Sequence, residues 1–342
     1  MNASKPILII HQGALGDLIM SLPALYSMRL FHGSTPWNMA GNPETLALLH
    51  RRFYAQEVVS IHRKDWAGLF QEKSKVPDRF RDFLSSFQKA YLFSANKPEV
   101  LIQGLFSAGL AKTVWIPSFP DVQQNSSLQS LQKEILKFEN IPWVESEKII
   151  FPSPEDLQKG LEYLRQIPKP GEGLPLWAMH SGSGSPHKNW PLEGFLEVAQ
   201  ELRSLKKAQP FFLMGPVEQE TSPETVKMIE ARGFPIIRSV TLPVLAGVLS
   251  QCAGYLGNDS GVSHLAAALG LPTVVLFGPT DPIFWGPKGK KVRILSPSIP
   301  CAPCIPETRR VCLHKGCLAS LTARQVLETI DTVQGSRFKV QG

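Results

Sequence analysis

The sequence GNDSGVSH places an acid and several small polar residues directly before a run of alanine and leucine. The run predicts a helix, and the unpaired backbone N–H groups at a helix start can bind an anion. Ser260, Gly261 and Ser263 could therefore surround a phosphate. Asp259 would repel a phosphate, so it suits better a helix cap or an acceptor for sugar hydroxyls. His264 is most simply a helix residue bonded to a neighbouring loop, and a phosphate contact is the lesser alternative.

A second segment, HSGSGSPHKNWP, is rich in glycine and serine and also precedes a predicted helix. The hydroxyls and backbone N–H groups of Ser181 and Ser183 suit a phosphate, and Lys188 would add a positive charge. A flexible loop with a solvated lysine explains the same residues equally well. If both segments face one place, two helix N-termini converge on one ligand, which would suit a diphosphate.

Glu218 lies in the sequence GPVEQE, which follows a predicted strand at 210–215. Its carboxylate could accept hydrogen bonds from ribose hydroxyls. Taken alone, a surface glutamate in the first turn of a helix is the simpler reading, because acids are favourable there.

The sequence HQGALGD, near the start of the chain, joins a short apolar strand to a helix. Gly13 and Gly16 permit close turns of the backbone. From spacing alone, Asp17 is best explained as a helix cap. At the carboxyl edge of a parallel sheet it could instead take a proton from a substrate hydroxyl.

The cysteines are clustered, with the spacing C-x2-C-x7-C-x4-C. Four thiolates could hold structural zinc or iron, with His314 as a spare ligand, and the alternative is a loop of reduced, unligated cysteines. Cys252 lies in an apolar helix and is expected only to pack. The clustered residues are Cys301, Cys304, Cys312 and Cys317.

These segments lie within two series of alternating strands and helices. Such a pattern predicts an α/β protein of two units. The pattern restarts after a proline- and glycine-rich stretch at 167–175, and residues 64–88 are expected to form a helical insertion. An amphipathic helix at 322–334 closes the series. The expected domains are 1–168, 169–322, and a C-terminal helical segment 323–342 that packs back toward the first domain. The predicted strands are 6–10, 57–62, 89–93, 112–117, 176–181, 210–215, 235–240, 254–259 and 272–278.

The composition is that of an ordinary globular protein, with 342 residues, 43% of them hydrophobic and a formal net charge of +7. The charge favours acidic partners such as nucleotides, phosphates or an anionic lipid surface, without choosing among them. The first residues lack the pattern of a secretory signal, and no stretch approaches the ~20 apolar residues of a membrane span. A cytoplasmic location is therefore expected.

Taken together, these blocks resemble glycosyltransferase family 9, the ADP-heptose:lipopolysaccharide heptosyltransferase family, over nearly the whole chain. The similar blocks are ILIIHQGALGDLIMSLPAL, HSGSGSPHKNWPLEGFLEVAQEL, LMGPVEQE and, most specifically, GNDSGVSHLAAALGLPTVVLFGPTDPIFWGP. The resemblance implies a GT-B fold, with two Rossmann-like α/β domains facing a central cleft. It also implies an inverting transfer of heptose from ADP-heptose to a lipopolysaccharide inner-core or related acceptor, with no metal needed for catalysis.

The resemblance further implies roles for single residues. The N-terminal domain, with its glycine loop of Gly13 and Gly16, would bind the acceptor, and Asp17 would be the general base. The C-terminal domain would bind the donor through a set of residues matched by position: Ser181, Ser183, Lys188 on phosphate, Glu218 on ribose, and Asp259, Ser260, Gly261 and His264 on the sugar and diphosphate.

Two features depart from the family pattern, namely the stretch FSANKPEVLIQGLF and the insertion at 64–88. Both lie in the half that would choose the acceptor. An enzyme using another nucleotide sugar or acceptor, an epimerase of the same fold, and a non-catalytic nucleotide-sugar-binding protein are the alternatives. A nicotinamide oxidoreductase is disfavoured because G-x-G-x-x-G is missing. Nucleic acid is not expected as a partner, whereas peripheral contact with the inner membrane is.

Overall fold

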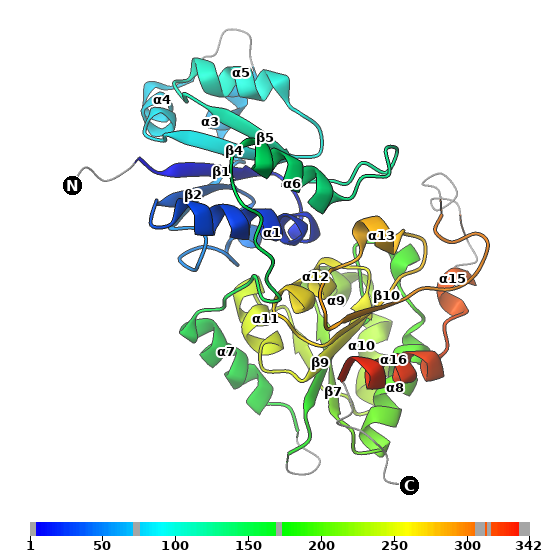
Figure 1. Ribbon diagram of the computed structural model, residues 1–342. Coiled ribbons are helices and arrows are strands. Elements are labelled where there is room, and N and C mark those ends of the chain that lie inside the picture. Colours follow the sequence, from blue (N-terminus) through cyan, green and yellow to red (C-terminus); the bar gives the residue numbers. More distant parts are fainter. Residues whose placement is uncertain (1–4, 71–75, 169–172, 305–311, 313–315, 335–342) are drawn as a thin grey trace. The chain divides into compact units, whose positions relative to one another are not determined.

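The computed structural model describes residues 5–70, 76–168, 173–304, 312 and 316–334. The chain divides into two compact units, Met1–Phe151 and Pro152–Gly342. Each unit is a parallel sheet with helices along its faces (Figure 1), as the alternating pattern predicts. Among the described residues, no helix is long and apolar enough to cross a membrane.

The sheet of the N-terminal unit has the strand order β3-β2-β1-β4-β5, and every pair is parallel. The chain runs outward from β1 to β3 and then returns to β4 on the other side of β1. The order therefore reverses between β1 and β4, where ligands of α/β sheets bind at the carboxyl ends of the strands. The strands are β1 (Ile7–His11), β2 (Trp37–Gly41), β3 (Glu57–Ser60), β4 (Lys89–Ser94) and β5 (Thr113–Pro117).

The central strand β1 is buried over its whole length, because its run of leucine and isoleucine meets helices on both faces. Leu8, Ile10 and Leu92 pack against Trp66, Phe80 and other apolar side chains of the insertion and of the helix after β4. Figure 1 shows α1 and α6 on the opposite face of this sheet. The helices are α1 (Leu15–His32), α2 (Pro43–Leu46), α3 (Lys64–Ala67), η1 (Gly68–Phe70), α4 (Asp78–Ser85), α5 (Glu99–Ser107) and α6 (Leu128–Phe138).

The sheet of the C-terminal unit has the parallel order β11-β10-β9-β6-β7-β8. The order reverses between β6 and β9, so the loops after these two strands meet at the ligand-binding edge. The strands are β6 (Leu176–His180), β7 (Gln209–Met214), β8 (Ile236–Arg238), β9 (Gly254–Asn258), β10 (Thr273–Leu276) and β11 (Val292–Leu295).

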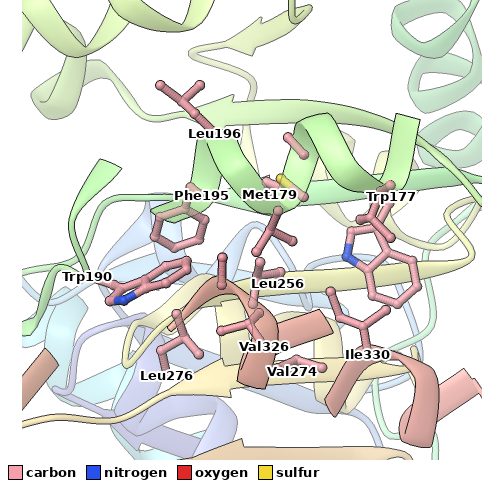
Figure 2. Close-up of a cluster of buried hydrophobic side chains, with 14 of the residues drawn as sticks. Trp177, Met179, Trp190, Phe195, Leu196, Leu256, Val274, Leu276, Val326 and Ile330 are labelled. Carbon is pink, nitrogen blue, oxygen red and sulfur yellow. The ribbon is translucent and has the colours of Figure 1, made fainter. Parts of the chain in front are cut away.

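Helices cover this second sheet and close its core. Figure 2 shows Val326 and Ile330 of α16 directed toward Leu256 and Val274 of the sheet, with Trp177 beside them. The helices are α7 (Pro154–Arg165), η2 (Pro186–Lys188), α8 (Leu192–Ser204), α9 (Pro216–Thr221), α10 (Pro223–Ala231), α11 (Leu242–Leu249), α12 (Gly261–Ala268), α13 (Pro282–Trp285), α15 (Gly316–Ala319) and α16 (Ala323–Gln334).

The division between the units differs from the expected boundary at 168. Helix α7 belongs to the C-terminal unit, because it packs against α11 through two glycines. A Cβ on Gly160 would overlap the backbone of Gly247, and one on Gly247 would overlap the carbonyl of Asp156. The proline- and glycine-rich stretch after α7 therefore lies within this unit, and its residues 169–172 are outside the described part.

The described part of the expected C-terminal helical segment is α16, which buries its apolar face in the core of its own unit. The expected packing toward the first domain stays a prediction. Val326 and Ile330 are fully buried there, because their spacing of four places them on one face of the helix. Residues 335–342 of the expected segment lie outside the described residues.

Several elements have no counterpart among the sequence predictions, among them β2, β11, α6 and α7. Strand β2, WNMAG, has no β-branched residue and so lacks the usual strand signal. The PVEQE segment is the short helix α9, so Glu218 lies in the first turn of a helix, as the simpler of its two readings predicts. Pro216 begins α9, and the Glu218 side chain caps it by accepting a hydrogen bond from the Gly215 N–H.

Candidate functional site

The turn after β1 is held by His11, the last residue of that strand. The Gly13 N–H donates to His11 Nδ1 at 3.2 Å, so the ring proton of the neutral histidine is on Nε2. Nε2 lies 3.2 Å from Ser21 Oγ, which in turn donates to the Asp17 carbonyl oxygen at 2.9 Å. Burial lowers the pKa of His11 to about 4, against the opposing effect of a hydrogen bond to the Asp17 backbone. The neutral His11 ring therefore connects the start of the turn to its end through hydrogen bonds.

Asp17 is the third residue of α1, and its carboxylate is partly exposed. Its Oδ2 accepts a hydrogen bond from the Ala14 N–H at 2.9 Å, so Asp17 does cap the helix, but from inside it, and Ala14 is the N-cap. A Cβ on Gly13 would lie 2.5 Å from the Asp17 Cβ, so the close turn requires glycine. Gly16 is the second residue of α1. The carboxylate thus lies at the carboxyl end of β1, where a general base could act.

In the C-terminal unit, Asn258 joins the two segments that suit an anion. It is fully buried at the end of β9. Its Nδ2 donates to the Ser181 carbonyl oxygen at 2.8 Å, and its Oδ1 accepts from the Trp190 N–H at 3.0 Å. The two segments lie side by side at one edge of the sheet, because β6 and β9 are neighbouring strands.

The acid of the GNDSGVSH segment, Asp259, forms an ion pair instead of facing an anion with an uncompensated charge. Lys188 Nζ lies 2.7 Å from Asp259 Oδ2, and that oxygen also accepts a hydrogen bond from Thr280 Oγ1 at 2.6 Å. The Asp259 side chain is 7% exposed and the Lys188 side chain 25%. The suggestion that Asp259 caps the helix is wrong: Ser260 is the N-cap of α12, and its Oγ accepts from the Ser263 N–H.

His264 is buried in α12 beside this ion pair. Burial lowers its pKa to about 4; the charge of Asp259 raises the pKa, that of Lys188 lowers it, and a hydrogen bond to the Trp285 backbone raises it. The imidazole is therefore neutral near pH 7 and bonded to the α13 segment, in agreement with the simpler of its two expected roles. Gly261 is the first residue of α12, so its N–H belongs to the helix start.

The segment 181–188 is a loop with its own short turn, η2, and α8 begins only after it. The expected second helix start is therefore not at the serines, because Pro191 is the N-cap of α8. Ser183 Oγ instead lies 2.6 Å from Asn189 Oδ1 and 2.7 Å from the Ser185 carbonyl oxygen, which holds the loop closed. Lys188 lies in η2.

The Glu218 side chain lies at the same edge of the C-terminal sheet as the loops after β6 and β9. Its Oε1 is 2.9 Å from His180 Nε2, and its Oε2 accepts from the Gly215 N–H at 2.7 Å. Burial raises the pKa of Glu218, but the hydrogen bond and charge of His180 and the Gly215 N–H outweigh it, so the pKa is lowered. The Cβ of any larger residue at Gly182 would overlap this carboxylate. The other ring nitrogen of His180, Nδ1, is 3.4 Å from Ser260 Oγ.

His180 and Gly182 were not singled out from the sequence. The available signal was a histidine that ends an apolar strand directly before a glycine- and serine-rich loop.

A cavity of about 420 Å³ lies beside Glu218 in the C-terminal unit. It combines apolar walls with a few polar groups, as small-molecule sites do. Its lining residues are Ser181, Gly182, Asn189, Trp190, Pro191, Leu192, Met214, Glu218, Ser222, Thr225 and Ala319.

The cysteine cluster does not form a metal site within the described residues, where no group of three or more His, Cys, Asp or Glu side chains could hold an ion. Cys304 Sγ is directed to the Cys301 carbonyl oxygen at 3.2 Å. Burial raises the pKa of Cys317, a hydrogen bond to the Leu318 backbone opposes this effect, and the nearby cysteines add to it. His314 and most of the segment between Cys304 and Cys317 lie outside the described residues. Cys252 is buried and hydrogen-bonded to the Val248 carbonyl oxygen, in keeping with a packing role.

Comparisons with known proteins agree with this architecture. Residues 153–314 match the model of glycosyltransferase family 9 (heptosyltransferase). Lipopolysaccharide heptosyltransferase 1 of Pseudomonas aeruginosa is 30% identical over 159 residues, which cover 46% of this chain and 44% of the relative. Lipooligosaccharide heptosyltransferase 2 of Campylobacter jejuni subsp. jejuni is 23% identical over 335 residues, which cover 92% of this chain and 95% of the relative.

Solved structures share the whole fold. The family 9 glycosyltransferase of Veillonella parvula has a TM-score of 0.75 at 19% identity and covers 98% of both chains. E. coli ADP-heptose lps heptosyltransferase II has a TM-score of 0.70 at 17% identity, with 96% of this chain and 98% of that chain covered. The iron-containing dodecameric glycosyltransferase TibC of E. coli has a TM-score of 0.57 at 13% identity, with 98% and 77% covered. The expected GT-B fold is confirmed, and the match to glycosyltransferase family 9 (heptosyltransferase) covers residues 153–314.

Proposed function

We propose that this glycosyltransferase moves a heptose from ADP-heptose to the inner core of lipopolysaccharide or a related acceptor. The family and the heptosyltransferases among its relatives support the transferred sugar. A structural relative that is an ADP-heptose enzyme supports the donor.

The proposal rests on four groups at the carboxyl ends of β6, β7 and β9. They are Glu218 on the wall of a cavity, Lys188, the N-terminus of α12, and the loop that carries Ser181 and Ser183. The 420 Å³ cavity is large enough for a nucleoside, and Glu218 on its wall can accept from ribose hydroxyls. Lys188 and the N-terminus of α12 come together through the Lys188–Asp259 ion pair, and both favour a diphosphate. Ser181 and Ser183 belong to the loop that follows β6, and Asn258 joins this loop to the end of β9.

The reaction that fits these groups is a direct displacement with inversion. Asp17 takes the proton from the acceptor hydroxyl, and the oxygen attacks the anomeric carbon of the heptose from the face opposite the nucleotide. The bond from that carbon to the diphosphate oxygen breaks, and its electron pair leaves with ADP. Lys188 and the α12 N–H groups stabilise the negative charge that develops on the leaving diphosphate. Because Asp259, itself held by a hydrogen bond from Thr280, already holds Lys188 in place, little reorganisation is needed.

A thermal-shift titration of the purified protein with ADP, UDP, GDP and ADP-heptose tests the donor. A ligand that binds the folded state raises its unfolding temperature by mass action. We expect stabilisation by ADP and ADP-heptose only, and stabilisation by UDP or GDP alone would overturn the donor assignment. Conversion of ADP-heptose to an isomer without any acceptor would indicate an epimerase instead.

We also propose a structural metal at the cysteine cluster, supported by the four-cysteine spacing and by the iron in the related TibC. The described residues alone do not supply a complete ligand set, so no catalytic step depends on this metal. Elemental analysis of protein purified without added metal should find about one zinc or iron per chain. The Cys301→Ser variant should lose it, and metal-free wild-type protein would refute the site.

Peripheral contact with an anionic membrane is the third part of the proposal. The net charge of +7 favours it, as does Phe106 on α5, which is 70% exposed beside a groove of about 460 Å³. We expect retention on anionic vesicles that high salt abolishes and that Phe106→Ser weakens. Absence of binding at low salt would exclude this contact.

A further inference from the structure

We propose that His180 and Gly182 are positioning residues that fix the Glu218 carboxylate toward the ribose of the donor and link it to Ser260 beside the diphosphate. The inference rests on the proposed donor site. It adds the two residues that give this site its discrimination for a nucleotide with free ribose hydroxyls.

The position of His180 follows from the strand order. It ends β6, which lies between β7 and β9 in the sheet. The loop after β7 carries Glu218, and the loop after β9 carries Ser260. A side chain at the end of the middle strand can therefore reach both loops, and the two ring nitrogens do so at 2.9 Å and 3.4 Å. At 5% exposure, the ring has little freedom to turn elsewhere.

The hydrogen bonds of Glu218 leave it able to receive a ligand. A carboxylate only accepts hydrogen bonds, and each of its oxygens can accept two. Oε1 has one partner in His180, and Oε2 has one in the Gly215 N–H. Each oxygen therefore keeps acceptor capacity, and Glu218 lines the 420 Å³ cavity. The vicinal hydroxyls of a ribose are donors that suit such a carboxylate.

Gly182 supplies the space for this arrangement. It follows His180 by two residues, and a Cβ at this position would occupy the place of Glu218 Oε1. An alanine would push the carboxylate away from the His180 ring without removing any polar group. Gly184, two residues further along the same loop, faces open space, with no atom within 4 Å of where its Cβ would lie, and serves as a matched comparison.

The two residues therefore act on Glu218 in different ways. His180 donates the hydrogen bond that orients the carboxylate, and Gly182 leaves room for it. If Glu218 turned freely, it would still carry its charge into the cavity but would lose its fixed direction. The expected consequence is a loss of discrimination between ribose and deoxyribose nucleotides, larger than the loss of affinity for the diphosphate.

Calorimetric titration of the full chain with ADP, 2′-deoxy-ADP and 3′-deoxy-ADP measures this directly and needs no acceptor. We expect the wild type to bind ADP about tenfold more tightly than at least one deoxy nucleotide, since a hydrogen bond to a charged group is of that order. Glu218→Ala should abolish this difference in affinity between ADP and the deoxy nucleotide. His180→Leu and Gly182→Ala should reduce it to less than about threefold, whereas His180→Gln, which keeps an N–H donor, should retain most of it.

Gly184→Ala is the control, because it alters the same loop without displacing Glu218. It should keep the wild-type ratio of the Kd values for the deoxy nucleotides and ADP. Far-ultraviolet circular dichroism shows whether each variant is folded. If the wild type discriminates but His180→Leu and Gly182→Ala discriminate equally well, the positioning role is refuted and the donor site stands. If the wild type binds all three nucleotides equally, the ribose contact of the proposed function is refuted. If it binds none of them, the donor site of the proposed function is refuted.

Discussion

In the N-terminal unit, the candidate site is a turn whose hydrogen bonds join residues two to ten positions apart. In the C-terminal unit, the hydrogen bonds that join one loop of the candidate site to another link residues 21 to 80 positions apart. The first site is centred on one neutral histidine and one carboxylate. The second combines an ion pair, a histidine–glutamate contact and a buried asparagine from three neighbouring strands.

This difference has a physical consequence. A turn with local contacts can be altered without changing the rest of its unit, so variants there should affect chemistry more than stability. The loops of the C-terminal unit hold one another in place, and buried charges there depend on their partners. Variants in that network should affect stability and ligand binding together.

The largest effect is expected at the turn. Asp17→Asn keeps an oxygen to accept from the Ala14 N–H but cannot take a proton, so turnover should fall about 10³-fold. The Kd for ADP should not change. Asp17→Ala should in addition cost about 1 kcal/mol of stability, because the cap is lost. Steady-state kinetics beside calorimetry checks both, and near-normal turnover by Asp17→Asn would remove its role as base.

The next effect concerns the ion pair of the C-terminal unit. Lys188→Met leaves the Asp259 carboxylate buried without its cation, which should cost about 3 kcal/mol of unfolding free energy in urea. The double variant Lys188→Met/Asp259→Asn removes the uncompensated charge and should regain most of that stability. Both should bind ADP weakly. Equal stability of Lys188→Met and wild type would show that the network does not depend on this pair.

A smaller effect on turnover is expected from the histidine that holds the turn. His11→Leu removes the acceptor for the Gly13 N–H, and turnover should fall by about ten- to a hundredfold with the ADP Kd unchanged. His11→Asn can still accept from that N–H and should be milder. A loss of ADP affinity in His11→Leu would contradict the expectation that the turn affects turnover without affecting donor binding.

The most gradual expected effect is a dependence of stability on pH that both units share. His11 and His264 have a folded-state pKa of about 4 against an ordinary value of 6.5. Between these values the unfolded chain binds more protons, so stability is complete above pH 6.5 and falls as the pH drops toward 4. Each histidine should contribute a slope of at most about 1.4 kcal/mol per pH unit. Urea titrations at several pH values should show a shallower slope for His11→Asn and for His264→Gln, and an unchanged slope would count against a neutral buried ring.

The sequence alone was enough for the features that depend on near neighbours. The α/β alternation, the central strand β1 and the amphipathic helix α16 follow from apolar periodicity, which is read over a few residues. The turn of Gly13 and Asp17 follows from the geometry of a strand that leads into a helix. The chemical types at Lys188, Glu218 and Asp259 were also visible, because each stands in the segment that follows a predicted strand.

Only the tertiary structure decided what depends on strand order. It placed α7 in the C-terminal unit through its contact with Gly247, and it gave Asp259 a partner in Lys188 in place of a capping role. It also made His180 a link between the loops of Glu218 and Ser260. No local pattern contains this information, because a hydrogen bond across 80 residues exists only once β6 lies between β7 and β9 in the folded sheet.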